Sequence, residues 1–226
     1  MKKLIACAVA AIAAVSMATA EITVGVRGVF GVGLGTTLAD DMDFADLDLG
    51  GTLNVGGTAF VKIPLVASLV VQPELGFTYN MVGAKMTMIS DGYAVKAEMN
   101  GAYNTIDIPI LVGWDFKINE RNDNFTITPL VGPKFSIPVG EFSAEIEASS
   151  GGISLNMPYD LDIDTSVLFS IVVGAGVAYK VGPGAIVGDL RYNIGASELK
   201  TEDSGEKIAI ATPRSLQLSV GYQISF

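Results

Sequence analysis

The sequence contains no histidine and a single cysteine, Cys7. Because Cys7 lies in the apolar N-terminal stretch, the chain beyond it can form no disulfide and offers no thiol for catalysis. Histidine is the side chain most often used as a general base near neutral pH, so its absence excludes the commonest acid–base and nucleophile–base arrangements. Any enzymatic function would have to rest on carboxylates, lysines or hydroxyls.

Long uncharged runs are also scarce. After residue 20 the longest one covers residues 165–179, which is 15 residues. A membrane-spanning helix needs about 20 apolar residues, so the sequence predicts no such helix there. Yet 50% of the residues are hydrophobic and the mean hydropathy is +0.46. A chain this apolar without a spanning helix suggests strands that meet lipid.

The first 20 residues have the pattern of a secretory signal peptide. Lys2 and Lys3 precede an uncharged stretch that ends in small residues at positions 18–20. We therefore expect residues 1–20 to be removed, leaving residues 21–226 as one domain. An uncleaved N-terminal membrane anchor is the alternative, which the small residues before Glu21 disfavour.

The clearest strand signal is the stretch 216–226. Its even positions are all apolar and its odd positions carry no large apolar side chain. Successive side chains of a strand point to opposite faces, so this stretch has one apolar and one polar face. Seven more segments alternate in the same way: residues 22–34, 53–65, 69–81, 105–116, 125–137, 166–180 and 186–195.

The connections between these eight segments alternate in length. Short ones follow the second, fourth and sixth segments, and long ones cover residues 36–51, 82–101, 139–164 and 196–213. Short turns on one side and long loops on the other are typical of membrane barrels. The sequence therefore predicts an all-β, eight-stranded antiparallel up-and-down transmembrane barrel, with both ends of the chain on the short-turn side.

Charged residues decide which face points inward. Nine of them share the polar face of the segments: Arg27, Lys62, Glu74, Asp107, Asp115, Lys134, Lys180, Asp189 and Arg191. A soluble barrel would have to show its apolar bands to water, at a large cost. We therefore expect these nine charges in the barrel interior and the apolar face in lipid. Six aromatic residues fall near the short-turn ends, as an aromatic girdle would: Trp114, Phe116, Phe125, Tyr179, Tyr222 and Phe226.

Four prolines oppose this arrangement, because a closed barrel has no free edge that could accommodate a missing N–H. They are Pro73, Pro109, Pro129 and Pro133. We predict β-bulges at these positions, since bulges recur at barrel rims.

Several motifs resemble a known family. They are residues 71–77 (VQPELGF), 106–111 (IDIPIL), 129–133 (PLVGP), 173–177 (VGAGV), 190–195 (LRYNIG) and the Gly221-Tyr222 pair. The chain resembles the bacterial outer membrane protein β-barrel family, also labelled porin family or PorT-like, with an OmpX/OmpA-like architecture. The resemblance covers the third to eighth segments and implies a barrel that tolerates prolines there. It implies no particular activity.

The resemblance further implies a location in the bacterial cell outer membrane and an assembly signal in the last strand. Its residues are Tyr222, Ile224 and Phe226. The expected partners are outer-membrane lipid, periplasmic chaperones and the barrel-insertion machinery. We expect no nucleic acid, no cofactor and no metal.

The remaining motifs predict no catalysis. Membrane-barrel enzymes generally use a histidine, so we expect no enzyme and no catalytic residue. Asp164-Thr165-Ser166 resembles half of an aspartic-protease site, but no second copy supplies the other carboxylate. Gly31 to Gly35 resembles a phosphate-binding loop without the helix that should follow it.

An acidic run occupies the first long connection. It consists of Asp40, Asp41, Asp43, Asp46 and Asp48, and its spacing does not match a calcium-binding EF-hand. A solvated acidic loop is the default interpretation, and weak divalent-cation binding is the alternative. The four long connections hold 17 acidic and 4 basic residues. Their negative field should favour cationic or divalent-bridged surface partners.

The sequence leaves two functions open. In the first, the protein is an outer-membrane barrel with a structural or surface-interaction role, whose interior is plugged by paired charges. In the second, it is a narrow porin, channel or carrier for small solutes. An eight-stranded barrel is just filled by its side chains, and five inward bases facing four inward acids should pair, which favours the first.

Overall fold

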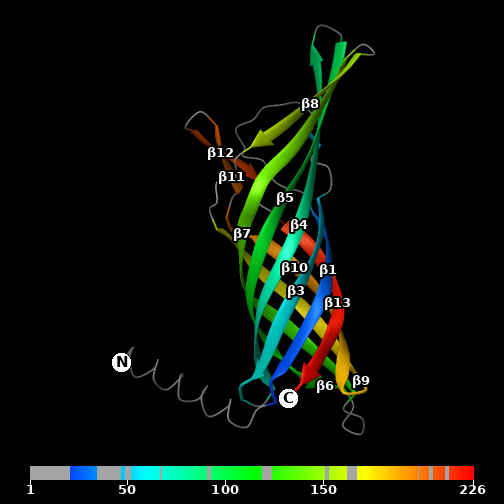
Figure 1. The fold of residues 1–226 in the computed structure, drawn as a ribbon, viewed down its shortest axis with the longest axis vertical. Coiled ribbons are helices and arrows are strands. Elements are labelled where there is room, and N and C mark those ends of the chain that lie inside the picture. The colour runs from blue at the N-terminus through cyan, green and yellow to red at the C-terminus, as the bar shows by residue number, and fades with distance from the viewer. Residues whose placement is uncertain are drawn as a thin grey trace, which may run out of the picture.

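The computed structural model describes residues 21–34, 47–48, 52–66, 68–90, 93–118, 124–150, 153–161, 167–197, 199–203, 206–211 and 214–226. Eight long strands form a barrel (Figure 1): β1 (Thr23–Gly33), β3 (Leu53–Pro64), β4 (Leu69–Ser90), β5 (Tyr93–Trp114), β7 (Phe125–Ser150), β9 (Leu168–Val181), β10 (Gly184–Gly195) and β13 (Arg214–Ser225). Each is antiparallel to its neighbours, and β13 closes the barrel on β1 along eleven residue pairs, from Thr23–Ser225 to Gly33–Ser215. The predicted fold is confirmed.

The alternation of the sequence explains which side chains lie outside. Along β1, Val24, Val26 and Phe30 are exposed, whereas Thr23 and Arg27 are buried. The same inside-out distribution recurs on the other seven strands, where exposed Leu, Ile, Val and Phe side chains cover the outer wall. Such a wall suits lipid rather than water. Within the described residues, no helix has the length and apolar character needed to cross a membrane.

Short connections join the strands at one end of the barrel. Residues 65–68 link β3 to β4, and Gly182 and Pro183 link β9 to β10, with Gly182 at a positive φ of 62° that favours glycine. The two-residue β6 (Phe116–Lys117) lies beside the start of β7. The predicted girdle residues occupy this end, and Trp114, Phe116, Tyr179 and Phe226 are exposed on the outer wall.

Three strands extend far past the other end, where the sequence pattern had suggested loops (Figure 1). β4 and β5 contain 22 residues each and β7 contains 26. β8 (Ile153–Leu161) pairs with the far part of β7, and the two-residue β2 (Leu47–Asp48) pairs with β4. A separate hairpin joins β11 (Leu199–Asp203) and β12 (Glu206–Ala211). The prediction that residues 82–101 and 139–164 are loops was therefore wrong for their described parts, which are 82–90, 93–101, 139–150 and 153–161.

The four prolines do not form bulges, so that prediction was also wrong. The register between β7 and β9 is constant across Pro129 and Pro133, and the register between β4 and β5 is unchanged on either side of Pro73 and Pro109. A proline fits an extended strand because its fixed φ lies within the β region, and it removes only one ladder hydrogen bond.

The one change of register among the described barrel strands lies elsewhere. β5 and β7 shift against each other between Ala102 and Asn104, where the partner of Asn104 is Val139 and the partner of Ala102 is Ser143. Gly140 lies in this bulge at a φ of 85°, a conformation that glycine adopts at little cost. The bulge marks the level at which the sheet leaves the barrel.

Candidate functional site

The nine charged residues of the polar face belong to seven of the eight barrel strands and to the residue after β5. Arg27, Glu74, Asp107, Asp189 and Arg191 are buried inside the barrel. Lys62, Asp115 and Lys134 are only partly buried. Lys62 lies beside Asp115, and Lys134 lies beside Asp107. Inward charges on non-adjacent strands meet because the barrel is narrow enough for opposite walls to touch.

Two arginines and two carboxylates form a central cluster across the barrel. Arg191 reaches both oxygens of Glu74, each at 2.9 Å, in a bidentate pair, and its Nη2 lies 3.6 Å from Asp189. Arg27 pairs with the same two carboxylates through its two Nη atoms. Each guanidinium therefore faces two carboxylates. The net charge of the cluster is zero, which limits the cost of burying four ions.

Neutral hydrogen-bond donors complete the cluster. The side-chain amide of Gln72 donates to Glu74 at 2.7 Å, and the hydroxyl of Ser219 donates to Asp189 at 2.9 Å. Phe60 is buried and its ring lies under the Arg27 guanidinium, with 4.5 Å between Cζ and the ring centroid. A cation over an aromatic face gains further electrostatic attraction in a dry interior. The cluster thus spans β1, β3, β4, β10 and β13.

Two smaller groups flank the central cluster. Asp107 accepts hydrogen bonds from Thr78 at 2.7 Å and Ser136 at 2.6 Å, and Lys134 Nζ lies 3.1 Å from it. Nearer the short-turn end, Lys62 pairs with Asp115 at 2.6 Å. The hydroxyl of Thr128 donates to the same Asp115 oxygen, also at 2.6 Å. Eight of the nine predicted charges therefore have an opposite charge beside them.

Lys180 is the exception. It is exposed, one residue before the end of β9 and two before Gly182 of the turn. Its position has the inward parity, but the interior ends at this level, so the prediction that Lys180 lies in the barrel interior needs correction. The ammonium group can reach water at the rim.

Apolar side chains also fill the interior, which the sequence analysis missed. Leu111, Leu130 and Val172 are almost completely buried and contact one another. They come from β5, β7 and β9. Each occupies a position of inward parity, and this parity was the signal that could have identified them. They line the wall opposite β1, so charged groups fill only part of the cross-section.

Little free space remains between these groups. One small cavity, of about 20 Å³, is lined by Arg27, Asp107, Lys134 and Asn193 among others. A second of about 20 Å³ lies toward the short-turn end beside Lys62, Gln72 and Gln223. Each has room for about one water molecule. The Nε atoms of Arg27 and Arg191 and the Oδ1 atom of Asn193 have no protein partner, so waters in the first cavity could satisfy them.

The interior site consists of paired charges and hydrogen bonds. Within the described residues, no group of three or more carboxylate or thiol ligands is arranged to hold a metal ion. The interior carboxylates Glu74, Asp107, Asp115 and Asp189 are engaged by arginine, lysine and hydroxyl groups.

The three residues of the predicted assembly signal lie on the outer wall. Ile224 and Phe226 are exposed, and the Tyr222 hydroxyl donates to the carbonyl oxygen of Val181 at 3.2 Å. Other predicted features lie outside the described residues: the signal peptide at 1–20, Asp164-Thr165-Ser166, and all of the acidic run except Asp48. Asp48 pairs in register with Lys85 on the extended part of β4.

One family model and several solved structures are similar to this chain. The family model described as outer membrane protein beta-barrel domain matches residues 5–223. Neisserial surface protein A shares 16% identity and a TM-score of 0.38, over 91% of this chain and 97% of that one. Ail, the attachment invasion locus protein of Yersinia pestis, solved with the heparin analogue sucrose octasulfate, shares 15% identity and a TM-score of 0.39, over 92% and 97%. An outer membrane channel from Pseudomonas putida F1 shares 8% identity and a TM-score of 0.31, over 91% and 96%. A search of curated proteins finds no significant match.

Proposed function

Because the chain belongs to the outer membrane protein beta-barrel domain family and lies in the bacterial outer membrane, we propose that it acts at the cell surface through the sheet that rises beyond its barrel. The observation that supports this role most strongly is strand length. A membrane-spanning strand needs about 9–11 residues, whereas β4, β5 and β7 contain 22, 22 and 26. Roughly half of each strand therefore exceeds the length that a membrane crossing requires, and Figure 1 shows β4, β5 and β7 rising past the other barrel strands.

This raised sheet, defined as residues 82–101 of β4 and β5 with 143–161 of β7 and β8, has features of an interaction surface. Residues Lys85, Glu98, Glu147 and Asn156 follow one another across the four strands in register. Glu147 is exposed, and so are Asn100, Ser143 and Glu145. β8 pairs with β7 alone among the described strands, so its other edge carries backbone N–H and C=O groups that another chain could pair with.

The acidic connections are part of the same proposal. Their excess of acidic over basic residues should attract cationic partners or allow divalent-bridged contacts, and such contacts weaken as salt rises past about 0.15 M, where the Debye length is about 8 Å. The absence of histidine and the engaged carboxylates support a non-enzymatic role.

A variant that lacks most of the raised sheet, called the shaved barrel, tests the surface role. In this variant a two-residue Asn-Gly turn replaces residues 84–99, and a second replaces residues 144–159, so that the registered pairs Gly83–Asn100 and Ser143–Asp160 flank each new turn. We expect the barrel to assemble normally and to bind a polycationic probe on cells more weakly than wild type, because the two deleted segments together carry a net charge of −2. Unchanged probe binding by the shaved barrel would contradict the proposal. The intact protein at high salt serves as the control for the electrostatic part.

We also propose that the interior is plugged. The central cluster crosses the barrel between the two small cavities, and each of its four described charges is paired with an opposite charge rather than free to hydrate a pore. The runner-up function is a narrow channel or carrier. Purified protein in planar bilayers should give no lasting conductance, and stable openings on the nanosiemens scale would favour the channel instead.

Periplasmic chaperones and the barrel-insertion machinery are the partners we propose for assembly. The end of β13 presents Tyr222, Ile224 and Phe226 on the outer wall, next to β1, where the barrel closes. An alternating apolar strand ending in an aromatic residue is the feature such machinery would recognise.

A further inference from the structure

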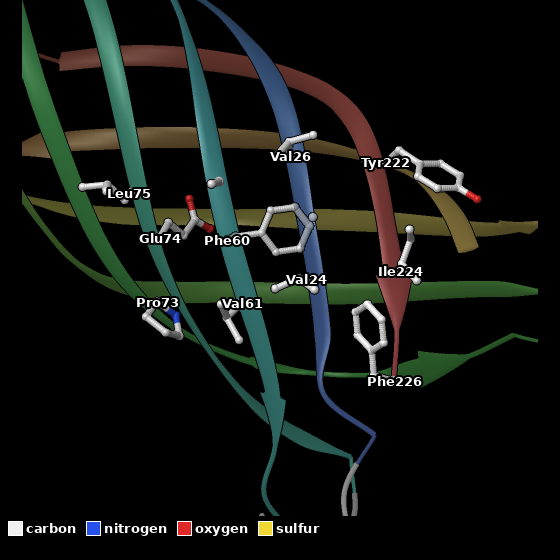
Figure 2. A pocket seen from close by; sticks show the side chains of 12 residues that line it. Val24, Val26, Phe60, Val61, Pro73, Glu74, Leu75, Tyr222, Ile224 and Phe226 are labelled. Carbon is white, nitrogen blue, oxygen red and sulfur yellow. The ribbon is translucent and has the colours of Figure 1, made fainter. Parts of the chain in front are cut away.

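A hollow interrupts the outer wall near the short-turn end of the barrel (Figure 2). It has a volume of about 600 Å³ and crosses β13, β1, β3 and β4. Small-molecule sites in proteins typically enclose about 300–1,000 Å³. This hollow, however, opens on the face that meets lipid, so its ligand must come from the membrane.

The strand register explains why the wall is hollow at this point. One row of paired outward residues runs Tyr222, Val26, Ala59, Leu75 from β13 to β4. The next row places Ile224, Val24 and Val61 side by side, with Phe226 beyond them. Large side chains at both ends and small ones in the middle leave a depression over Ala59 and Val26.

Two further features shape the floor. The Phe60 ring lies behind Gly25, where a Cβ on Gly25 would come within 2.4 Å of the ring, so the ring closes the wall from inside. Backbone pairing between β3 and β4 stops at Phe60–Glu74 and resumes at Ile63–Val71, across the position of Pro73, which has no N–H to donate.

The lining is hydrocarbon in character. Val24, Val26 and Leu75 are exposed side chains, and the Tyr222 hydroxyl is already bonded to Val181. Glu74 contributes to the wall, but its carboxylate is held inside by the two arginines. A hollow without outward hydrogen-bond donors selects a ligand by shape and dispersion contacts alone.

We propose that this hollow binds one acyl chain of a phospholipid from the periplasmic leaflet, more tightly than the lipid around the rest of the barrel. We infer the periplasmic leaflet from the position of the hollow beside the short turns, and we infer an acyl chain as the ligand from the apolar lining. A second barrel is a poorer occupant, because its convex wall cannot reach the floor past the rim formed by Tyr222, Phe226 and Leu75. An acyl chain is narrow enough to lie along it.

A matched pair of variants tests the proposal. Ala59→Phe fills the hollow, whereas Ala175→Phe places the same ring on an exposed alanine of β9, four strands away around the barrel. The proteins are released from nanodiscs of defined phospholipids and analysed by native mass spectrometry. We expect wild type and Ala175→Phe to retain one phospholipid, and Ala59→Phe to retain about tenfold less, because the chain loses its buried methylene contacts.

Further measurements keep the result decisive. Val26→Trp fills the same hollow from β1 and replaces Ala59→Phe if that variant does not fold. Phosphatidylethanolamine and phosphatidylglycerol with identical chains should be retained equally. The proposal is overturned if the filled variants retain lipid like wild type, if wild type retains none, or if retention depends on the headgroup. A wild-type dimer that Ala59→Phe dissociates would also overturn it, in favour of a second copy.

Discussion

Replacing Glu74 with alanine should destabilise the barrel more than any other single change in its interior. The Glu74 carboxylate accepts from Arg191 through both oxygens, at 2.9 Å each, and also pairs with Arg27. Its side chain is 1% exposed. Without it, Asp189 alone faces two buried guanidinium groups, and the central cluster carries an uncompensated positive charge in a dry interior.

The magnitude follows from that imbalance. Removing one partner of a buried ion pair costs about 3–5 kcal/mol of unfolding free energy. Since the urea dependence of small proteins is about 1–3 kcal/mol per molar, a loss of about 3 kcal/mol lowers the unfolding midpoint by at least about 1 M. Replacing Glu74 with leucine together with Arg191 with methionine should cost less than Glu74→Ala, because Arg27 and Asp189 then remain as a balanced pair.

Urea unfolding in phospholipid vesicles measures the effect, with the fluorescence of Trp114, the only tryptophan, as the signal. Glu147→Ala is the matched control, because Glu147 is exposed on the raised sheet and its loss should change stability by less than about 0.5 kcal/mol. If Glu74→Ala unfolds at the same urea concentration as Glu147→Ala, the central cluster does not stabilise the barrel and the reasoning fails.

Three other changes give distinct outcomes. Gly221→Ala should lower the free energy of unfolding by about 1–3 kcal/mol through overpacking, because the new Cβ would lie 2.0 Å from the Val26 carbonyl oxygen. Gly28→Ala should be tolerated, because its Cβ would meet nothing closer than 4.0 Å. Urea unfolding midpoints compare the two variants. Tyr222→Asp should leave the protein in the periplasm for degradation, and normal outer-membrane levels on fractionation would refute this. Replacing the five aspartates of the acidic run with asparagine should weaken binding of a polycationic probe to cells without affecting assembly. If probe binding changes neither with this replacement nor with salt concentration, the acidic run is only solvated surface.

The raised sheet shows how a clear pattern can mislead. Between Leu75 and Met81 the apolar side chains of β4 occupy odd, outward positions, whereas Val82, Ala84, Met86 and Met88 occupy even positions. This change of phase looks like the end of a strand. Asp91-Gly92 and Gly151-Gly152 are dipeptides typical of two-residue hairpins, a signal that the sequence analysis overlooked. The phase changes because the outer face meets lipid within the membrane and no longer does beyond it.

By itself, the sequence determined the barrel, the inward parity of its charges and the outward apolar wall, because side chains alternate with a period of two and lipid tolerates no unpaired charge. It could not determine that Arg27 meets Asp189, from the other end of the chain, or that Lys62 meets Asp115. Those pairs depend on strand tilt and register around a closed barrel, which bring residues from non-adjacent strands to one level. Tertiary structure alone also decided that Tyr222, Ala59 and Leu75 fall in one row, since a row across four strands exists only once their register is set.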